Sequence, residues 1–131
     1  MQDASRHYIN GQWVASIDGR EVTVENPSTE KKIATITLGG VADADAAVAA
    51  ANTAFPLWAA TDPLGRITAL ERLMEVYKSR AEEMAQAIST EMGAPIALAK
   101  TAQVGSGAGH LKNTIRAVKA FAFERPLGDH A

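Results

Sequence analysis

Between Ile67 and Ile88 the apolar residues recur at alternating intervals of three and four, the spacing of one face of an α-helix. This apolar stripe consists of Ile67, Leu70, Met74, Tyr77, Ala81, Met84 and Ile88. Charged and amide side chains occupy the opposite face, so the helix is expected to be half buried and half solvated. Pro63 suits the first helical position and Gly93 suits the end. We therefore predict one unbroken helix over residues 63–91.

A stripe of this length requires a broad apolar surface to cover it. The hydrophobic fraction of the chain is 47%, but much of it is alanine, which buries little area per residue. The other predicted helices offer mostly alanine to the stripe. We therefore expect its partner to be a β-sheet that lies beyond residue 131.

The N-terminal part alternates apolar and polar residues with the period of two that is typical of strands. Asn10-Gly11 separates two short runs of this kind and suits a type I′ hairpin turn, because both residues tolerate positive φ. Two further alternating runs follow, over residues 21–25 and 34–38. These patterns predict a small antiparallel strand unit.

The period changes to that of a helix after Gly40, where alanine becomes the dominant residue. Three helices are expected, over residues 43–54, 63–91 and 96–123. The length of 131 residues favours one domain. Residues 1–40 would form its strand unit and residues 41–131 its helical segment, which makes the chain an α+β piece.

Composition excludes several kinds of partner and chemistry. The formal net charge is −2 and no long basic run occurs, so neither nucleic acid nor an anionic membrane surface is an expected partner. No uncharged apolar run is long enough to cross a bilayer. Cysteine is absent, which removes disulfides, thiolate metal ligands and a cysteine nucleophile from these residues.

The glycine-rich run from Gly105 to Gly109 invites a dinucleotide-binding interpretation. That motif requires a third glycine where His110 stands, and it follows a strand, whereas no strand is predicted before Gly105. Close packing of small residues between helices, with Gly105 and Gly109 one turn apart, is the simpler interpretation.

The remaining polar candidates have structural explanations. His7, His110 and His130 are far apart in sequence, and none has the spacing of a zinc ligand set. Asp43, Asp45 and Asp62 lie near the starts of helical segments, where a carboxylate caps free backbone N–H groups or interacts favourably with the helix dipole in the first turn, and Asp43 is the expected N-cap of its helix. Residue types alone therefore indicate no active site.

Five segments nevertheless occur in a characteristic order. They are Tyr8–Val14, Val24–Thr29, Ile33–Ile36, Ala54–Ala59 and Ser89–Pro95. In order and spacing they resemble the N-terminal region of the aldehyde dehydrogenase superfamily, and the resemblance covers essentially the whole chain. It implies an α/β fold in which the strand unit is followed by three helices that pack on a Rossmann-like sheet. Residues 1–131 would then be the N-terminal part of the cofactor-binding domain.

The resemblance also implies an activity for the parent enzyme. Members of the family oxidise an aldehyde to a carboxylic acid with NAD or NADP, through a cysteine thiolate that attacks the aldehyde. The cysteine, glutamate, asparagine and lysine of that machinery lie downstream of this segment in the family. We therefore expect residues 1–131 alone to be inactive, and the full-length protein to be a cytoplasmic homo-oligomer, a dimer or a tetramer.

One site is carried over from the family. Many members bind a monovalent cation through backbone oxygens that correspond to Val24 and Glu25 here, together with an acidic side chain that corresponds to Glu91. The family often has aspartate at that last position, and the alternative is that Glu91 is a solvated residue near a helix end. Two other hypotheses for the chain stay open, a non-catalytic helical interaction module and a truncated remnant of the enzyme.

Overall fold

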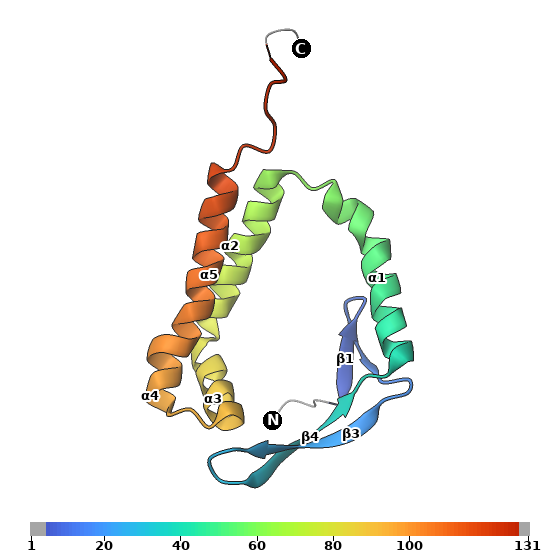
Figure 1. Cartoon of the computed structure of the whole chain (residues 1–131), viewed down its shortest axis with the longest axis vertical. Helices are drawn as coiled ribbons and strands as arrows, with labels where there is room; N and C mark the ends of the chain where they lie inside the picture. Colours follow the sequence, from blue (N-terminus) through green and yellow to red (C-terminus); the bar gives the residue numbers. More distant parts are fainter. Residues whose placement is uncertain (1–4, 129–131) are drawn as a thin grey trace. The chain divides into compact units, whose positions relative to one another are not determined.

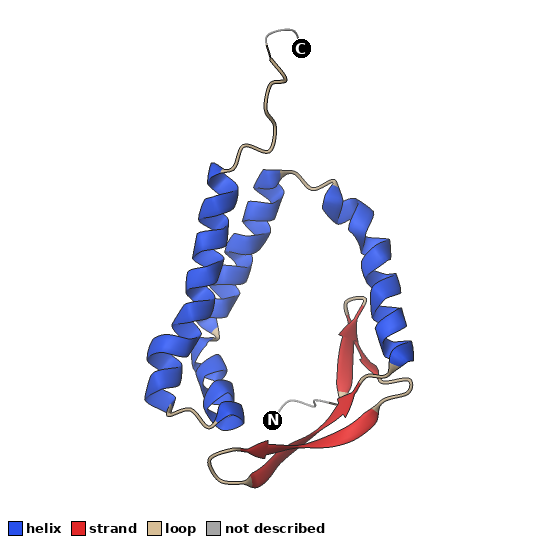
Figure 2. Cartoon of the chain, in the orientation of Figure 1, coloured by secondary structure: helices blue, strands red, loops and turns tan. Residues whose placement is uncertain are grey.

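The computed structural model describes residues 5–128, with strands in the N-terminal part and helices after them (Figure 1). The strands are β1 (Arg6–Ile9), β2 (Gln12–Ala15), β3 (Arg20–Asn26) and β4 (Lys31–Leu38). The helices are α1 (Val41–Ala59), α2 (Pro63–Ser79), α3 (Ala81–Met92), α4 (Ile96–Leu98), the π-helix η1 (Ala99–Gln103) and α5 (Val104–Ala120). Figure 2 distinguishes the two kinds of element by colour.

The chain divides into two compact units. Unit 1 contains the residues up to Thr61 together with Ala87–Pro95, and unit 2 contains Asp62–Gln86 together with the residues from Ile96 onward. The strands, α1 and the end of α3 therefore belong to unit 1. The helices α2, α4 and α5 belong to unit 2.

Strands β1 and β2 form the predicted hairpin. Asn10 and Gly11 connect them with φ values of 52° and 77°, the left-handed conformation that the type I′ turn requires. Tyr8 lies opposite Trp13, and their ring centroids are 5.3 Å apart. Aromatic pairs across two strands stabilise a hairpin, so the sequence selects both the turn and the register.

Strands β3 and β4 form a second, separate two-stranded antiparallel sheet. Val24 pairs with Ala34 but Glu25 pairs with Lys32, so the register shifts between Val24 and Glu25. Such a bulge interrupts the regular ladder of backbone hydrogen bonds. After β3 the Asn26 side chain accepts hydrogen bonds from the backbone N–H groups of the next residues, which closes the turn toward β4.

Helix α1 begins earlier than predicted. Gly40 is its N-cap, and Asp43 lies in the first turn, where its carboxylate accepts a hydrogen bond from the Gly40 N–H at 3.0 Å. The prediction that Asp43 is the N-cap was therefore wrong. Because a carboxylate three residues after the cap can satisfy the cap's own N–H, the helix does not need a polar side chain at residue 40.

The single helix predicted over residues 63–91 is two helices. Asp62 caps α2 as expected, because its side chain accepts from the Gly65 N–H at 2.7 Å. The break falls at Arg80, whose φ of −107° and ψ of 16° leave the helical region. Helix α3 then ends at Met92, before Gly93 with φ 68°, so the predicted glycine stop is confirmed.

The break at Arg80 shifts the buried face of the second helix. Ile67 and Met74 of the apolar stripe are 8% and 9% exposed, as the spacing predicts. Beyond the break Met84 is 41% exposed, whereas its neighbour Ala85 is 1% exposed. One non-helical residue is enough to displace the phase of an amphipathic pattern, so the stripe is continuous in sequence but not in space.

Within unit 2, α2 packs along α5 (Figure 1). The Tyr77 hydroxyl donates a hydrogen bond to the Val104 carbonyl oxygen at 2.9 Å, at the point where η1 gives way to α5. Helix α5 therefore covers part of the stripe on α2, and a β-sheet beyond residue 131 as a further partner stays a prediction. Helix α5 ends at Ala120, three residues before the predicted end.

Candidate functional site

The Asp43 carboxylate accepts hydrogen bonds from three other residues of unit 1. One oxygen accepts hydrogen bonds from the Ser16 hydroxyl at 2.5 Å and from the Gly40 N–H, and the other accepts from the Ile17 N–H at 2.8 Å. Ser16 and Ile17 follow β2, whereas Asp43 belongs to α1. Asp43 is 5% exposed. Its hydrogen bonds join the loop after the first hairpin to the start of α1.

These hydrogen bonds lower the pKa of Asp43 from 3.8 to about 2. The Ser16 hydroxyl has the largest effect, the Ile17 N–H follows, and burial of the carboxylate opposes both. The group is therefore ionised at neutral pH, with its oxygens occupied by protein donors. A carboxylate in this state is a poor general acid or base, so we assign Asp43 a structural role.

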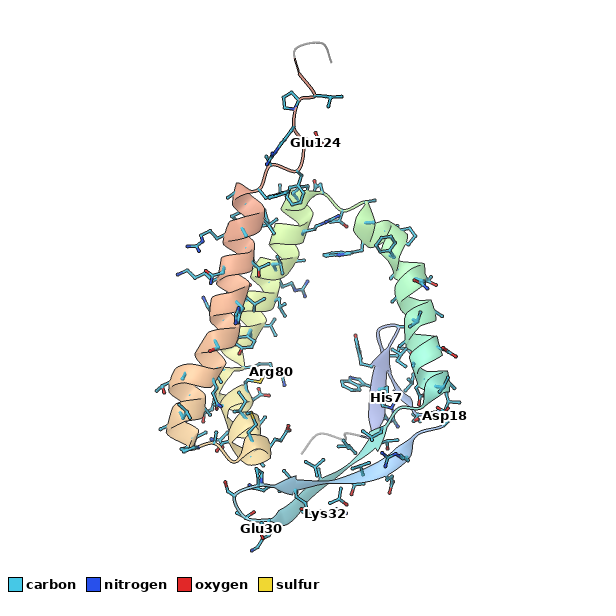
Figure 3. The ribbon with its side chains drawn as sticks, in the orientation of Figure 1. His7, Asp18, Glu30, Lys32, Arg80 and Glu124 are labelled. Carbon is cyan, nitrogen blue, oxygen red and sulfur yellow. The ribbon has the colours of Figure 1, made fainter. Side chains whose placement is uncertain are left out.

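Two further residues surround the start of α1. Asp18 accepts a hydrogen bond from the Ala42 N–H, and a Cβ on Gly40 would lie 2.1 Å from an Asp18 carboxylate oxygen, so a side chain at residue 40 would require Asp18 to move. The Nε2 atom of His7, on β1, is buried and has no hydrogen-bond partner within residues 5–128. Figure 3 labels His7 and Asp18.

An open hollow of about 380 Å³ lies beside Asp43. Its lining combines the first hairpin with the start of α1 and consists of Ile9, Asn10, Gln12, Val14, Ala15, Ile17, Asp43 and Ala46. Asp43 is its single charged residue, and that carboxylate is already saturated with hydrogen bonds. The hollow therefore lacks the pair of reactive groups that acid–base or nucleophilic catalysis requires.

The residues expected to bind a monovalent cation all lie in unit 1. Val24 is half-buried on β3, Glu25 is exposed next to it, and Glu91 is exposed in the last turn of α3. The β-bulge falls between Val24 and Glu25, so it interrupts the ladder at the two residues whose backbone oxygens the family resemblance nominates.

A direct contact joins the chain just after Glu25 to the chain just after Glu91. The Ser28 hydroxyl donates to the Gly93 carbonyl oxygen at 3.0 Å. A Cβ at Gly93 would lie 2.5 Å from the Ser28 Oγ atom and 3.0 Å from Pro27, so the close approach requires glycine. The fold thus fixes the turn after β3 against the end of α3.

Side chains alone do not form a metal site in the described part of the chain. Within residues 5–128, no three side chains of His, Asp or Glu gather where they could hold a metal ion. His130 lies outside the described residues. The predicted cation site depends on two backbone oxygens and one carboxylate, so it stays a prediction.

The glycine-rich run lies inside α5 and follows another helical segment rather than a strand. A Cβ at Gly107 would lie 2.3 Å from the Tyr77 hydroxyl oxygen, whereas Gly105 and Gly109 have open space beside them. The prediction that Gly105 and Gly109 pack closely against a neighbour is therefore wrong within the described residues, and the close approach occurs at Gly107 instead. Sequence reasoning missed this contact because nothing in the spacing shows which glycine faces an aromatic residue of α2.

The sequence model of the aldehyde dehydrogenase family matches residues 13–127 of this chain. The chain belongs to this family. A curated relative, 3-succinoylsemialdehyde-pyridine dehydrogenase from a Pseudomonas species, is 40% identical over 98% of the chain. The match occupies 27% of that relative, so the chain spans about a quarter of the length of the aldehyde dehydrogenases it matches.

Solved structures of the family have the same fold over these residues. The crystal structure of an aldehyde dehydrogenase from Bartonella henselae is 40% identical, with a TM-score of 0.93 over all of this chain and 28% of its own. Aldehyde dehydrogenase C from Pseudomonas syringae, a mutant solved with NAD+ and octanal, is 39% identical, with a TM-score of 0.92. That alignment covers 96% of this chain and 26% of the other.

The strand unit followed by helices is thus an α/β fragment of an aldehyde dehydrogenase, as the resemblance implies. Among the described residues, no helix is both long and apolar enough to cross a membrane.

Proposed function

We propose that this chain is the N-terminal portion of an enzyme that oxidises an aldehyde to a carboxylic acid with NAD or NADP. Within that enzyme it would be a structural part of the cofactor-binding domain. The observation that carries the proposal is the family match, which extends over residues 13–127 in one uninterrupted span. The NAD+ and octanal bound to the Pseudomonas syringae relative support the same cofactor and substrate class.

The residues of this chain do not supply the chemistry. The sequence has no cysteine for the nucleophile. The run from Gly105 to Gly109 forms part of α5, so the turn between strand and helix that cradles a dinucleotide phosphate is not built there. We therefore expect residues 1–131 alone to have no dehydrogenase activity, and we place nucleophile and cofactor site in the remainder of the enzyme.

The apolar residues left exposed support a structural role. In unit 1 Phe55 is 65% exposed and Leu57 81%, and in unit 2 Leu64 is 69% exposed. Within each unit, large apolar side chains that are exposed to this extent are expected to be covered by another part of the enzyme. The Rossmann-like sheet of the enzyme is the surface that we propose covers the helices.

The mass of the natural gene product tests the proposal. Peptides from Gly65 to Arg80 identify the product in an extract, and its intact mass is compared with the 13.8 kDa of these residues. A product several times heavier that oxidises aldehydes supports the proposal. A product of 13.8 kDa contradicts it and favours the helical interaction module, whose exposed apolar residues would then bind a separate partner.

We also propose that Val24, Glu25 and Glu91 bind a monovalent cation in the full-length enzyme. Two carbonyl oxygens and a carboxylate are ligands suited to a hard cation. Two features support this proposal. The bulge between Val24 and Glu25 interrupts the regular backbone hydrogen bonds at these residues. The contact of Ser28 with Gly93 fixes the segment after Glu25 against the segment after Glu91.

Thermal unfolding of the full-length enzyme in potassium, sodium or choline chloride at equal ionic strength tests the cation site. The inorganic cations should raise the melting temperature relative to choline. Glu91→Gln should remove that difference, whereas the matched control Glu75→Gln, on the exposed face of α2, should keep it. Equal melting temperatures in all three salts would exclude the site.

The proposals for quaternary state and location rest on the family resemblance alone. We propose that the full-length enzyme is a homo-oligomer, a dimer or a tetramer, in the cytoplasm. Light scattering coupled to size-exclusion chromatography measures the first, and cell fractionation the second. A monomeric or exported enzyme would contradict the corresponding part.

A further inference from the structure

Asn10 differs from the other asparagines of this chain in the residue that follows it. The chain contains asparagine at positions 10, 26, 52 and 113, and glycine follows the first of these alone. Asn10 is exposed at the tip of the first hairpin, and its side chain makes no hydrogen bond within residues 5–128. Gly11 has no atom near the position that a Cβ would occupy.

We propose that Asn10 is a site of spontaneous deamidation. The backbone nitrogen of Gly11 loses its proton to solvent and attacks the Asn10 side-chain carbonyl carbon. A bond from nitrogen to carbon forms, the bond to the amide nitrogen breaks, and ammonia leaves with a proton from water. Water then opens the resulting five-membered succinimide at either carbonyl, which gives aspartate or isoaspartate at residue 10.

The hairpin controls how often this ring can close. Closure requires rotation about the Asn10 backbone, which the left-handed turn restrains while the strands remain paired. Strands β1 and β2 contain four residues each, and among residues 5–128 no third strand joins their sheet. A two-stranded hairpin of this size is marginally stable, so the turn opens frequently. Glycine at residue 11 adds no side chain to hinder the rotation.

The other asparagines are protected for different reasons. Asn26 precedes Pro27, which has no backbone N–H to attack with, and its side-chain oxygen already accepts from Ser28 and Thr29. Asn52 lies within α1 and Asn113 within α5. The N–H that follows each is committed to a helical hydrogen bond, so at least one turn of helix must unravel before a ring can form.

The two products differ in what they do to the hairpin. Aspartate followed by glycine suits the same type I′ turn, so this product keeps the pairing of Tyr8 with Trp13. Isoaspartate carries an additional methylene group in the main chain and cannot retain the two-residue turn. It therefore releases the pairing of β1 with β2 and disturbs the hollow beside Asp43, whose lining includes Asn10.

Peptide mapping of the full-length enzyme, incubated at mildly alkaline pH, tests the proposal. Asn10 should deamidate about tenfold faster than Asn113, the ratio given by about 1.4 kcal/mol in local opening free energy. Isoaspartate should appear together with aspartate, and the isoaspartate form should lose protection from hydrogen exchange in residues 6–15. Asn10→Asp is the matched control, because it should keep that protection.

Two results would overturn the proposal. One is retention of the Asn10 amide for as long as the Asn113 amide. The other is aspartate at residue 10 with no isoaspartate, because opening of a succinimide gives both. Neither result would affect the assignment of the chain to an aldehyde dehydrogenase.

Discussion

Replacing Gly107 with alanine tests how closely α2 and α5 pack. A Cβ at residue 107 would lie 2.3 Å from the Tyr77 hydroxyl oxygen and 2.7 Å from the ring carbon that carries it. Both distances are too short for atoms that are not bonded. Tyr77 must therefore move, and its hydrogen bond to the Val104 carbonyl must lengthen or break.

The expected magnitude is a balance of two effects. Alanine in place of glycine inside a helix stabilises it by about 1 kcal/mol. Loss of the hydrogen bond between Tyr77 and Val104 costs about 0.5 to 1.5 kcal/mol, and the additional packing strain costs about 1 to 3 kcal/mol. Gly107→Ala should therefore destabilise the pairing of α2 with α5 by roughly 0.5 to 3.5 kcal/mol. The sign is opposite to that expected from helix propensity.

Hydrogen exchange measured on peptides from α2 and α5 of the 131-residue chain gives the free energy of local opening of these two helices. Gly109→Ala is the matched control, because nothing lies within 4 Å of its added Cβ and it should stabilise α5 by about 1 kcal/mol. Combining Tyr77→Phe with Gly107→Ala should reduce the penalty, since it removes the oxygen at 2.3 Å.

If Gly107→Ala stabilises α5 as much as Gly109→Ala does, α2 and α5 do not pack closely at residue 107. The close packing is also contradicted if Tyr77→Phe leaves the effect of Gly107→Ala unchanged, because the two substitutions would then be independent. A uniform loss of protection over both helices in Gly109→Ala would contradict the open space at that residue.

Further predictions concern unit 1 and the start of α2. The pKa of Asp43 is lowered from 3.8 to about 2, so its ionised form stabilises the fold above about pH 4 and this contribution disappears as the pH falls toward 2. Asp43→Asn should be less stable at neutral pH and should lose that part of the acid transition in pH-dependent melting. Gly93→Ala should cost about 1 to 3 kcal/mol in thermal unfolding, because alanine would be strained at positive φ and would meet Ser28. Asp62→Ala should cost about 1 kcal/mol through loss of its bond to the Gly65 N–H, and Asp62→Asn should restore most of it.

Local signals in the sequence predicted the features that depend on a few neighbouring residues. Asn10-Gly11 predicted the hairpin and its left-handed turn, and Asp62 predicted the start of α2. Gly93 predicted the end of α3. Each of these is determined by backbone conformations or hydrogen bonds within a span of about four residues.

Features that depend on distant residues were missed. The stripe continues through Arg80 without interruption, so periodicity could not show the break that exposes Met84 and buries Ala85. The role of Asp43 depends on Ser16 and Ile17, which are 27 and 26 residues away along the chain. A carboxylate near a helix start has the same local pattern whether it caps that helix or joins it to a strand unit.

The candidate cation site also combines a local sequence motif with contacts between distant residues. Val24 and Glu25 precede Asn26-Pro27, a local motif that the family resemblance could place by number. The bulge between them depends on pairing with β4, and the contact of Ser28 with Gly93 joins residues 65 positions apart. The family resemblance therefore names the proposed ligands, whereas the bulge and the contact of Ser28 with Gly93 depend on the fold.

Two glycines of α5, Gly105 and Gly109, are not required by any contact within the described residues. Each glycine inside a helix costs about 1 kcal/mol relative to alanine. At Gly107 the close approach of Tyr77 explains why glycine is present. A Cβ at Gly105 or Gly109 would meet no neighbouring group within 4 Å among the described residues. Under the proposed function, another part of the enzyme packs against Gly105 and Gly109. The same part also covers Leu98 and Phe121, which are exposed in this chain. That one packing surface of the enzyme then accounts both for the two glycines and for the exposed apolar side chains of these helices.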